Sequence, residues 1–291
     1  MITMKSNMKA SFIITVVCCL AAARAVAAQP IPDSVKTGGF ALGLQAYTFK
    51  NFTVMEAIEK TAETGAKAIE FFPGQKLAKD GDAVLNHNAS GETIAALKAQ
   101  LEKHGVRAVN YGVVNAKGEQ EWRKIFELAK ALDLYAISTE AVDQLDIIEK
   151  LVKEYDIPVG IHHHYVRQDK PDYRLWDPSY ILSLVKDRDR RIGAAVDTGH
   201  WATSNVQPLA GLKILDGRII SVHLKDRMEI GKATRDVPFG AGILNVKAIL
   251  DELRRQNFAG NISIEYEYNW NNSVPDVAQC VGFFRGYAAC R

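Results

Sequence analysis

Histidine and acidic side chains of this sequence gather at the ends of short apolar runs. Five of the seven histidines closely follow three such runs, residues 159–161, 194–196 and 219–222. Imidazole and carboxylate groups are the ligands that hold Mn, Zn, Co or Fe in proteins, and carboxylates also hold Mg. The pattern therefore predicts one divalent metal ion (Mn, Zn, Co, Fe or Mg). Its expected ligands each end an apolar run: His162, Asp197, His223 and Glu265.

A single histidine after an apolar strand is more often a hydrogen-bonded core residue than a ligand. Four runs that end in the same way favour the metal, because a cation removes the cost of several kcal/mol per buried, unpaired charge. Glu140 is a further candidate ligand. For Lys225, a salt bridge to Asp197 or Glu265 is the alternative to a catalytic role.

A sugar carbonyl bound to such a metal has an acidic neighbouring C–H, and a general base within hydrogen-bond distance can remove that proton. The candidates for this proton transfer are Lys225, His164, His200, Glu140 and Glu267. The candidates for substrate binding are Glu70, Tyr47, Trp201, Asp226 and Asp236. For Glu70, a hydrogen bond to a loop amide is an equal alternative. The glycine-containing loop 236–242 is expected to form part of the substrate pocket.

These side chains need a fold that brings strand ends together. Eight β-rich runs alternate with helical segments from Leu42 to the C-terminus, which is typical of a parallel sheet with helical crossovers. Eight strands close a barrel whose active site lies at the C-terminal strand ends. We therefore predict a single (β/α)8 TIM barrel. The expected strands are Leu42–Thr48, Ala68–Phe72, Ala108–Val113, Ala136–Thr139, Val159–His164, Ile192–Asp197, Ile219–His223 and Ile262–Glu265.

Helix boundaries are also marked in the sequence. Capping boxes are expected at Thr53–Glu56 and Ser273–Asp276, and Asp177 before Pro178 is an expected helix start. Ser90 precedes a helical run that ends at Gly105. No glycine-rich phosphate loop follows the first expected strand, which disfavours an open, doubly wound sheet.

The first 28 residues have the three parts of a secretory signal: a basic start, an apolar run too short to span a bilayer, and a small-residue cleavage site at Ala25-Val26-Ala27. We expect residues 1–28 to be removed and residues 29–291 to form the barrel domain, exported to the periplasm or secreted. Removal leaves 33 basic against 34 acidic residues, a formal charge of −1. This charge gives no electrostatic basis for binding nucleic acid or anionic lipid. Cys280 and Cys290 remain, and we do not expect them to pair.

The sequence resembles the xylose-isomerase-like barrel superfamily from about Leu42 to the C-terminus. The resemblance is carried by Asp197-Thr-Gly-His200, His223-Leu-Lys-Asp226 and Ile264-Glu265. That superfamily includes ketose 3-epimerases, inosose dehydratases, sugar-phosphate isomerases and abasic-site endonucleases. The resemblance implies that Asp197, His223 and Glu265 bind the metal. One departure is His162, because the epimerases have at this point of the fifth strand a glutamate that is both ligand and base.

Three functions follow as expectations. The first is a metal-dependent sugar isomerase or epimerase that works through an enediolate. The second is a 3-keto-glycoside lyase or dehydratase with the same site, since the sequence is most similar to exported sugar isomerase-like proteins, some relatives of which cleave 3-keto-glycosides. The third is a non-catalytic periplasmic sugar-binding protein. In each case the expected partner is a small sugar, with no nucleic acid and no membrane after removal of the signal, and a homo-oligomer is left open.

Overall fold

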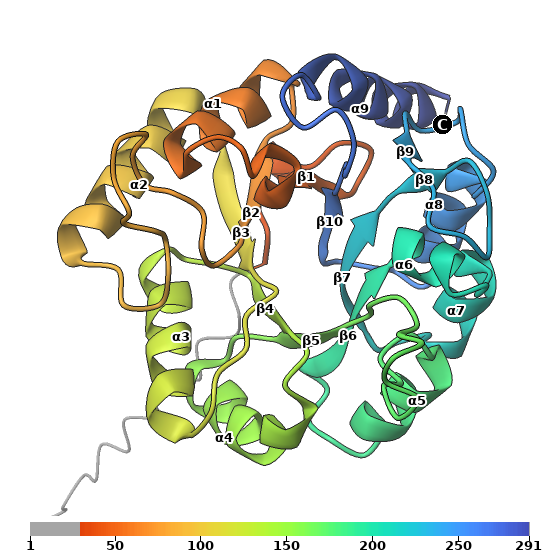
Figure 1. Ribbon diagram of the computed structural model, residues 1–291, viewed down its shortest axis with the longest axis horizontal. Helices are drawn as coiled ribbons and strands as arrows, with labels where there is room; N and C mark the ends of the chain where they lie inside the picture. The colour runs from red at the N-terminus through yellow and green to blue at the C-terminus, as the bar shows by residue number, and fades with distance from the viewer. Residues whose placement is uncertain (1–29, 291) are drawn as a thin grey trace, which may run out of the picture.

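A closed barrel of eight parallel strands forms the centre of the protein in this computed structural model, which describes residues 30–290 (Figure 1). The barrel strands are β1 (Ala41–Gln45), β2 (Ala68–Phe71), β3 (Arg107–Tyr111), β4 (Ala136–Thr139), β5 (Val159–His162), β6 (Ile192–Asp197), β7 (Ile219–Leu224) and β10 (Asn261–Ile264). Each strand pairs in parallel with the next one around the barrel, and β10 closes the ring by pairing with β1. The predicted (β/α)8 TIM barrel is confirmed. The expected signal lies outside the described residues.

Helices surround the barrel, and the last helix lies beside the first (Figure 1). They are α1 (Val54–Glu63), α2 (Gly91–His104), α3 (Glu119–Ala131), α4 (Leu145–Tyr155), α5 (Pro178–Val185), α6 (Thr198–Thr203), α7 (Pro208–Ile214), α8 (Val246–Arg255) and α9 (Val274–Ala289). Short 3-10 turns are η1 (Asp33–Val35), η2 (Ala46–Phe49) and η3 (Val142–Gln144).

The helix boundaries follow the local chemistry of the sequence at most of the expected places. The capping box of Thr53 and Glu56 is present, and the side chains of Ser90 and Asp177 cap α2 and α5. The cap expected at Ser273 is wrong: its hydroxyl donates instead to the carbonyl oxygen of Thr48, 3.5 Å away. Gly105 ends α2 in the left-handed conformation (φ +63°) that glycine adopts without strain.

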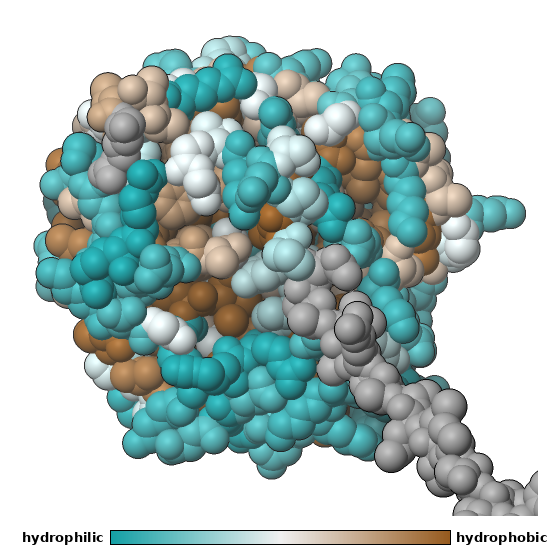
Figure 2. Space-filling model, turned by 180° about the vertical axis from the view of Figure 1, so that it is seen from behind, coloured by the Kyte–Doolittle hydropathy of each residue, from teal (hydrophilic) through white to brown (hydrophobic). Residues whose placement is uncertain are grey.

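The barrel strands are buried almost along their whole length, and only the first residues of β3 and β7 are partly exposed. One face of each strand packs inside the barrel and the other packs under the helices. This burial on both sides explains why the strands are continuous apolar runs rather than alternating ones. Seen from behind, mostly hydrophilic side chains surround a smaller hydrophobic area near the centre of the face (Figure 2).

Several strands differ from expectation by one to three residues, and three differences bear on the site. The strand β1 ends at Gln45, whose side chain caps η2, so Tyr47 lies on a 3-10 turn instead of a strand. The strand β5 ends at His162, so His164 lies on the following loop. A small antiparallel ribbon of β8 (Asp226–Arg227) and β9 (Asp236–Val237), which the sequence did not indicate, follows β7.

The remaining expectations concern membranes and cysteines. No helix of the described residues is long and apolar enough to cross a membrane. Cys280 is buried on α9 and Cys290 is exposed after it, and both are free thiols, as expected.

Candidate active site

The C-terminal ends of β6, β7 and β10 bring together the expected metal ligands Asp197, His223 and Glu265. One ligand atom from each residue lies within 4.8 Å of the others. Nδ1 of His223 is 3.2 Å from Oε2 of Glu265 and 3.8 Å from Oδ2 of Asp197. On the other side of Asp197, Nε2 of His162 is 3.8 Å from the same Oδ2. Four strands therefore contribute to one cluster of buried donor atoms.

Asp197 has a separate task for each of its carboxylate oxygens. Oδ1 accepts a hydrogen bond of 2.7 Å from the backbone N–H of His200 and so caps α6. Oδ2 makes no well-aligned hydrogen bond and faces the cluster, with the Lys225 ammonium 3.1 Å away. The short helix α6 begins directly after β6 with Thr198. The Thr198 hydroxyl accepts a hydrogen bond from the backbone N–H of Lys225 and donates one to the Lys225 carbonyl, and so joins the ends of β6 and β7.

Gly199 leaves room for Lys225 between these two strand ends. A Cβ atom at Gly199 would lie 2.5 Å from Cδ of Lys225, far closer than side-chain atoms approach each other. The glycine of the Asp-Thr-Gly-His sequence is therefore explained by the close approach of a lysine from the next strand. The resulting turn also places His200 next to Asp197, with Nε2 3.7 Å from Oδ2.

Glu70 orients His223 from the opposite side of the barrel. Its Oε1 is 3.0 Å from Nε2 of His223, and its Oε2 accepts hydrogen bonds from Ser263 (2.7 Å) and Asn261 (3.3 Å). Glu70 has no exposed surface. Glu70 was expected to contact the substrate. In the structure it contacts Nε2 of His223 instead, and Nδ1 of His223 faces the cluster. A carboxylate behind a ligating histidine is the usual companion of a metal site.

His162 is held from behind by Glu140, which follows β4. Nδ1 of His162 is 3.4 Å from Oε1 of Glu140, and the Tyr173 hydroxyl donates to Oε2 of Glu140 at 3.0 Å. Nε2 of His162 has no hydrogen-bond partner and faces Asp197. Burial alone would raise the pKa of Glu140, but its contact with His162 lowers the pKa below its ordinary value. Glu140 is thus a carboxylate at pH 7.

Lys225 lies among three carboxylates instead of facing an open cavity. Its Nζ is 3.1 Å from Asp197, 2.8 Å from Glu265 and 2.5 Å from Glu267. Burial would lower the pKa of Lys225, but these carboxylates raise it well above its ordinary value. The salt bridges weighed as the alternative for Lys225 are therefore present, and the ammonium remains charged at pH 7.

The donor atoms of the cluster fit a divalent cation. Nε2 of His162, Oδ2 of Asp197 and Nδ1 of His223 are buried and make no well-aligned hydrogen bond, although Lys225 lies 3.1 Å from this Oδ2 and Glu265 lies 3.2 Å from this Nδ1. Buried polar atoms without such bonds are rare in protein interiors, and a cation between these three would satisfy all of them. His200 belongs to a second possible ligand group with His162 and Asp197. A bound cation would share the oxygens of Asp197 and Glu265 with the Lys225 ammonium or displace it.

A cavity of about 520 Å³ opens beside this cluster. Of the sequence-predicted site residues, Tyr47, Glu140, His162, His164, His200, Glu265 and Glu267 line it. Burial lowers the pKa of both His164 and His200, so both imidazoles are neutral at pH 7 and can accept a proton. Tyr47 packs edge-on against Phe72 (5.2 Å between ring centroids) and Trp270 (5.7 Å), which forms an aromatic wall.

The lining residues that were not identified from the sequence include Gln45, Asn115 and Arg167. Gln45 ends β1 and donates to the carbonyl of Gly112 at 3.0 Å. Asn115 lies after β3, and its side-chain oxygen accepts from Thr139 and from the backbone of Glu140. The signal that could have revealed Gln45 is its place as the polar last residue of a barrel strand, whereas Asn115 lies on the loop after β3, which carries no hydrophobic periodicity.

The structure corrects the substrate-binding roles expected for Trp201 and Asp226. Trp201 has no exposed surface and packs against His163, with 4.7 Å between the ring centroids. A side chain buried in this way cannot stack on a sugar. Asp226 accepts hydrogen bonds from the backbone N–H groups of Gly240, Gly242 and Leu244, and so holds the loop after β9. A Cβ at Gly242 would meet Oδ1 of Asp226 at 2.2 Å.

Asp236 supports the site from behind, which corrects its expected substrate contact. Its Oδ2 accepts a hydrogen bond of 2.6 Å from the backbone N–H of Glu267, and its Oδ1 is 3.0 Å from Nε of Arg227. None of the described residues 236–242 lines the cavity, so this loop positions Glu267 and is not a wall of the pocket.

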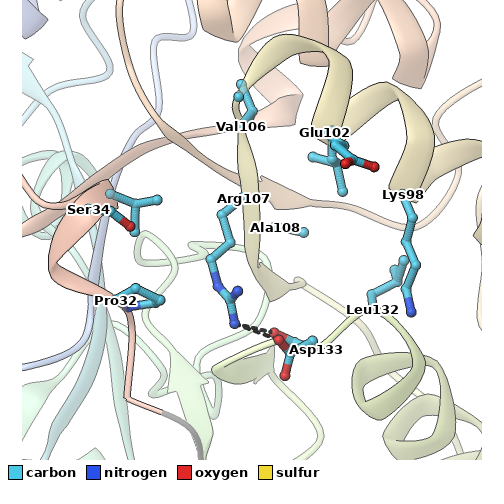
Figure 3. A pocket seen from close by; sticks show the side chains of 12 residues that line it. Pro32, Ser34, Lys98, Glu102, Val106, Arg107, Ala108, Leu132 and Asp133 are labelled. Atoms are coloured by element: carbon cyan, nitrogen blue, oxygen red, sulfur yellow. Dashed lines mark hydrogen bonds and ion pairs between the residues drawn. The ribbon is translucent and has the colours of Figure 1, made fainter.

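Another cavity, of about 420 Å³, opens at the opposite end of the barrel strands. It lies between η1, α2 and the start of β3, and Arg107 points toward Asp133, with which it forms an ion pair of 2.7 Å (Figure 3). None of the candidate ligands or proton-transfer groups lines it. The cavity beside Asp197 is therefore the candidate active site.

Comparison with known proteins gives one family match and several similar structures. A family model described as xylose isomerase-like TIM barrel matches residues 58–285. A solved structure of an uncharacterized protein from Parabacteroides distasonis is 32% identical, with a TM-score of 0.68, and the match covers 85% of this chain and 99% of that one. No curated protein matches this sequence significantly.

Two more distant structures carry functional names. A D-tagatose 3-epimerase-like protein is 19% identical with a TM-score of 0.67, and the match covers 86% of this chain and 97% of that one. A probable 3-DHS dehydratase from Bacillus anthracis is 16% identical with a TM-score of 0.63, and the match covers 82% and 96%. At these identities the likeness shows the fold alone.

Proposed function

The chain belongs to the xylose isomerase-like TIM barrel family, and we propose that it is a metal-dependent sugar isomerase or epimerase. The observation that carries this proposal is the convergence of buried donor atoms from Asp197, His223 and Glu265, which lie within 4.8 Å of one another. We further propose His162 as a ligand from β5. Imidazole and carboxylate donors together favour Mn, Co, Zn or Fe over Mg. The structure of a 3-epimerase-like protein shares this fold.

A divalent cation in this cluster would act as a Lewis acid that makes the C–H beside a sugar carbonyl acidic. The chain's own residues would then move the proton. His164 and Glu267 line the cavity from β5 and β10, which lie three places apart in the ring of eight strands. A base on each side of the substrate permits removal of a proton from one face and its return to the other. Return to the neighbouring carbon isomerises the sugar instead.

The roles of the remaining polar residues follow from their contacts. Nδ1 of His164 has no hydrogen-bond partner, so this neutral imidazole can take a proton without breaking an existing contact. Glu140 is bonded to His162 and to the Tyr173 hydroxyl and positions the ligand. Lys225 pairs with three carboxylates of the cluster and balances one of their negative charges. His200 is available either as a further ligand or as a donor to a substrate hydroxyl.

A lyase or dehydratase is the second candidate, and His162 favours it. An epimerase that uses two carboxylates needs one on the fifth strand, where this chain has an imidazole. Loss of a proton beside a carbonyl, followed by departure of a substituent from the next carbon, needs only one base. We also propose that the enzyme acts outside the cytoplasm, on the basis of residues 1–28.

The test is to incubate the Mn-loaded protein in heavy water with D-fructose and other free ketoses, and with 3-keto-glucosides, and to follow the products by NMR. Deuterium at the carbon beside the carbonyl, without bond cleavage, is expected. His223→Ala and Glu265→Ala should abolish both metal binding and label uptake, while Glu56→Gln on the surface of α1 should change neither.

Other outcomes point elsewhere. Release of an aglycone would favour the lyase. Sugar binding without label or cleavage would favour a binding protein and contradict the enzyme.

A further inference from the structure

Arg167 is an unpaired cation in the wall of the candidate active site. Among the described residues that line the cavity, it is the one lysine or arginine side chain. No ion pair joins its guanidinium to a carboxylate of the described residues, although Glu140, Glu265 and Glu267 line the same cavity. An arginine carries five N–H donors, so those of Arg167 remain available to a ligand.

The guanidinium of Arg167 is held in place before any ligand arrives. It lies over the ring of Tyr173, 4.7 Å from the centroid, and the Tyr173 hydroxyl is fixed by its bond to Glu140. The backbone is also braced, because Lys170 N–H donates to the Arg167 carbonyl and Val166 N–H donates to the Ser204 hydroxyl. An arginine stacked on an anchored ring loses little freedom when it binds a ligand.

Charge fixes which end of a substrate this arginine can bind. At the cluster the carboxylates of Glu265 and Glu267 already pair with Lys225, so among the described lining residues Arg167 alone offers an unpaired cation to a negative group. Arg167 stacks on Tyr173, whose hydroxyl binds Glu140, and Glu140 in turn contacts His162. A substrate with its carbonyl at the cluster could therefore place an anionic group against Arg167.

We propose that the substrate is a sugar acid whose carboxylate is bound by Arg167. A single planar guanidinium matches a carboxylate through two parallel hydrogen bonds. A phosphate is usually held by several donors, often with backbone N–H groups of a glycine-rich loop, and no second lysine or arginine lines this cavity among the described residues. The inference rests on the proposed function, because it assumes that the carbonyl binds at the cluster.

The experiment compares three ketoses that differ only at C6: D-fructose, D-fructuronate and D-fructose 6-phosphate. Their binding to the Mn-loaded wild-type protein is measured by isothermal titration calorimetry. Since one charge-assisted pair is gained, D-fructuronate should bind at least about tenfold more tightly than D-fructose. Arg167→Gln should remove this preference, and Arg167→Lys should retain part of it.

Arg174→Gln is the matched control, because Arg174 lies in the same loop and stacks on Tyr180 at 4.6 Å but pairs with Asp177. It should keep the wild-type preference. Equal affinity for D-fructuronate and D-fructose, including no detectable binding of either, would overturn the proposal. So would tighter binding of the phosphate than of the acid, or an Arg167→Gln variant that weakens all three ligands equally. A retained preference without deuterium uptake would overturn the isomerase but not the role of Arg167.

Discussion

The contribution of His163 to stability should fall on mild acidification because this residue is buried in its neutral form. His163 has no exposed surface, and its ring packs against Trp201 behind the active site. Burial lowers the pKa of His163 from 6.5 to about 3. Between these two values the unfolded chain binds a proton that the folded protein does not. Lowering the pH through 6.5 therefore favours unfolding, and raising it restores stability.

The size of this effect follows from the two pKa values. Between pH 7 and pH 5, protonation of the unfolded histidine removes about 2 kcal/mol of folding free energy. His163→Phe keeps an aromatic ring beside Trp201 but cannot titrate. The wild type should therefore lose about 2 kcal/mol more than His163→Phe over this range, measured by urea unfolding in the presence of a chelator.

A second variant separates titration from packing. Trp201→Phe alters the same contact without removing an ionisable group, so it should keep the wild-type dependence on pH. If the wild type and His163→Phe lose the same free energy within about 0.5 kcal/mol, His163 accepts a proton in the folded state and the reasoning fails.

Three further predictions concern the metal cluster and the mature protein. Glu70→Gln should weaken Mn binding about 10- to 100-fold in a competition titration with a chelating dye, because His223 loses the carboxylate that orients it; unchanged affinity would refute this role. Lys225→Met should unfold at a lower temperature than the wild type without metal but gain more from added Mn, since the ion replaces the lost ammonium; equal gains would contradict the sharing of oxygens. Mass spectrometry of the exported protein should find an N-terminus near Gln29, and an uncleaved chain would disprove the signal.

The barrel and the centre of its site were predictable because both depend on patterns along the chain. Apolar strand runs that end in a polar residue identify the C-terminal strand ends, and Asp197, His223 and Glu265 each end or follow such a run. The fold then brings these ends together without further information. The family resemblance named the same three residues.

The contacts between distant strands were not predictable in this way. Glu70 and His223 are 153 residues apart, and only the barrel register places them face to face. Trp201 lies on α6, which begins directly after Asp197, and its ring packs against His163 instead of facing the cavity. Asp226 and Asp236 were misassigned because two-residue strands such as β8 and β9 leave no periodic signal. Arg167 lies on a loop, where sequence gives no direction for a side chain.

The two oxygens of the Asp197 carboxylate make different contacts, which has a practical consequence for handling the enzyme. Because Oδ1 caps α6 and only Oδ2 faces the proposed ion site, removal of the ion leaves the helix capped. The ammonium of Lys225 meanwhile compensates the acidic groups left behind. The apoprotein should therefore survive dialysis against a chelator in its folded form. It can then be reconstituted with one transition metal at a time, which makes the native ion identifiable by titration.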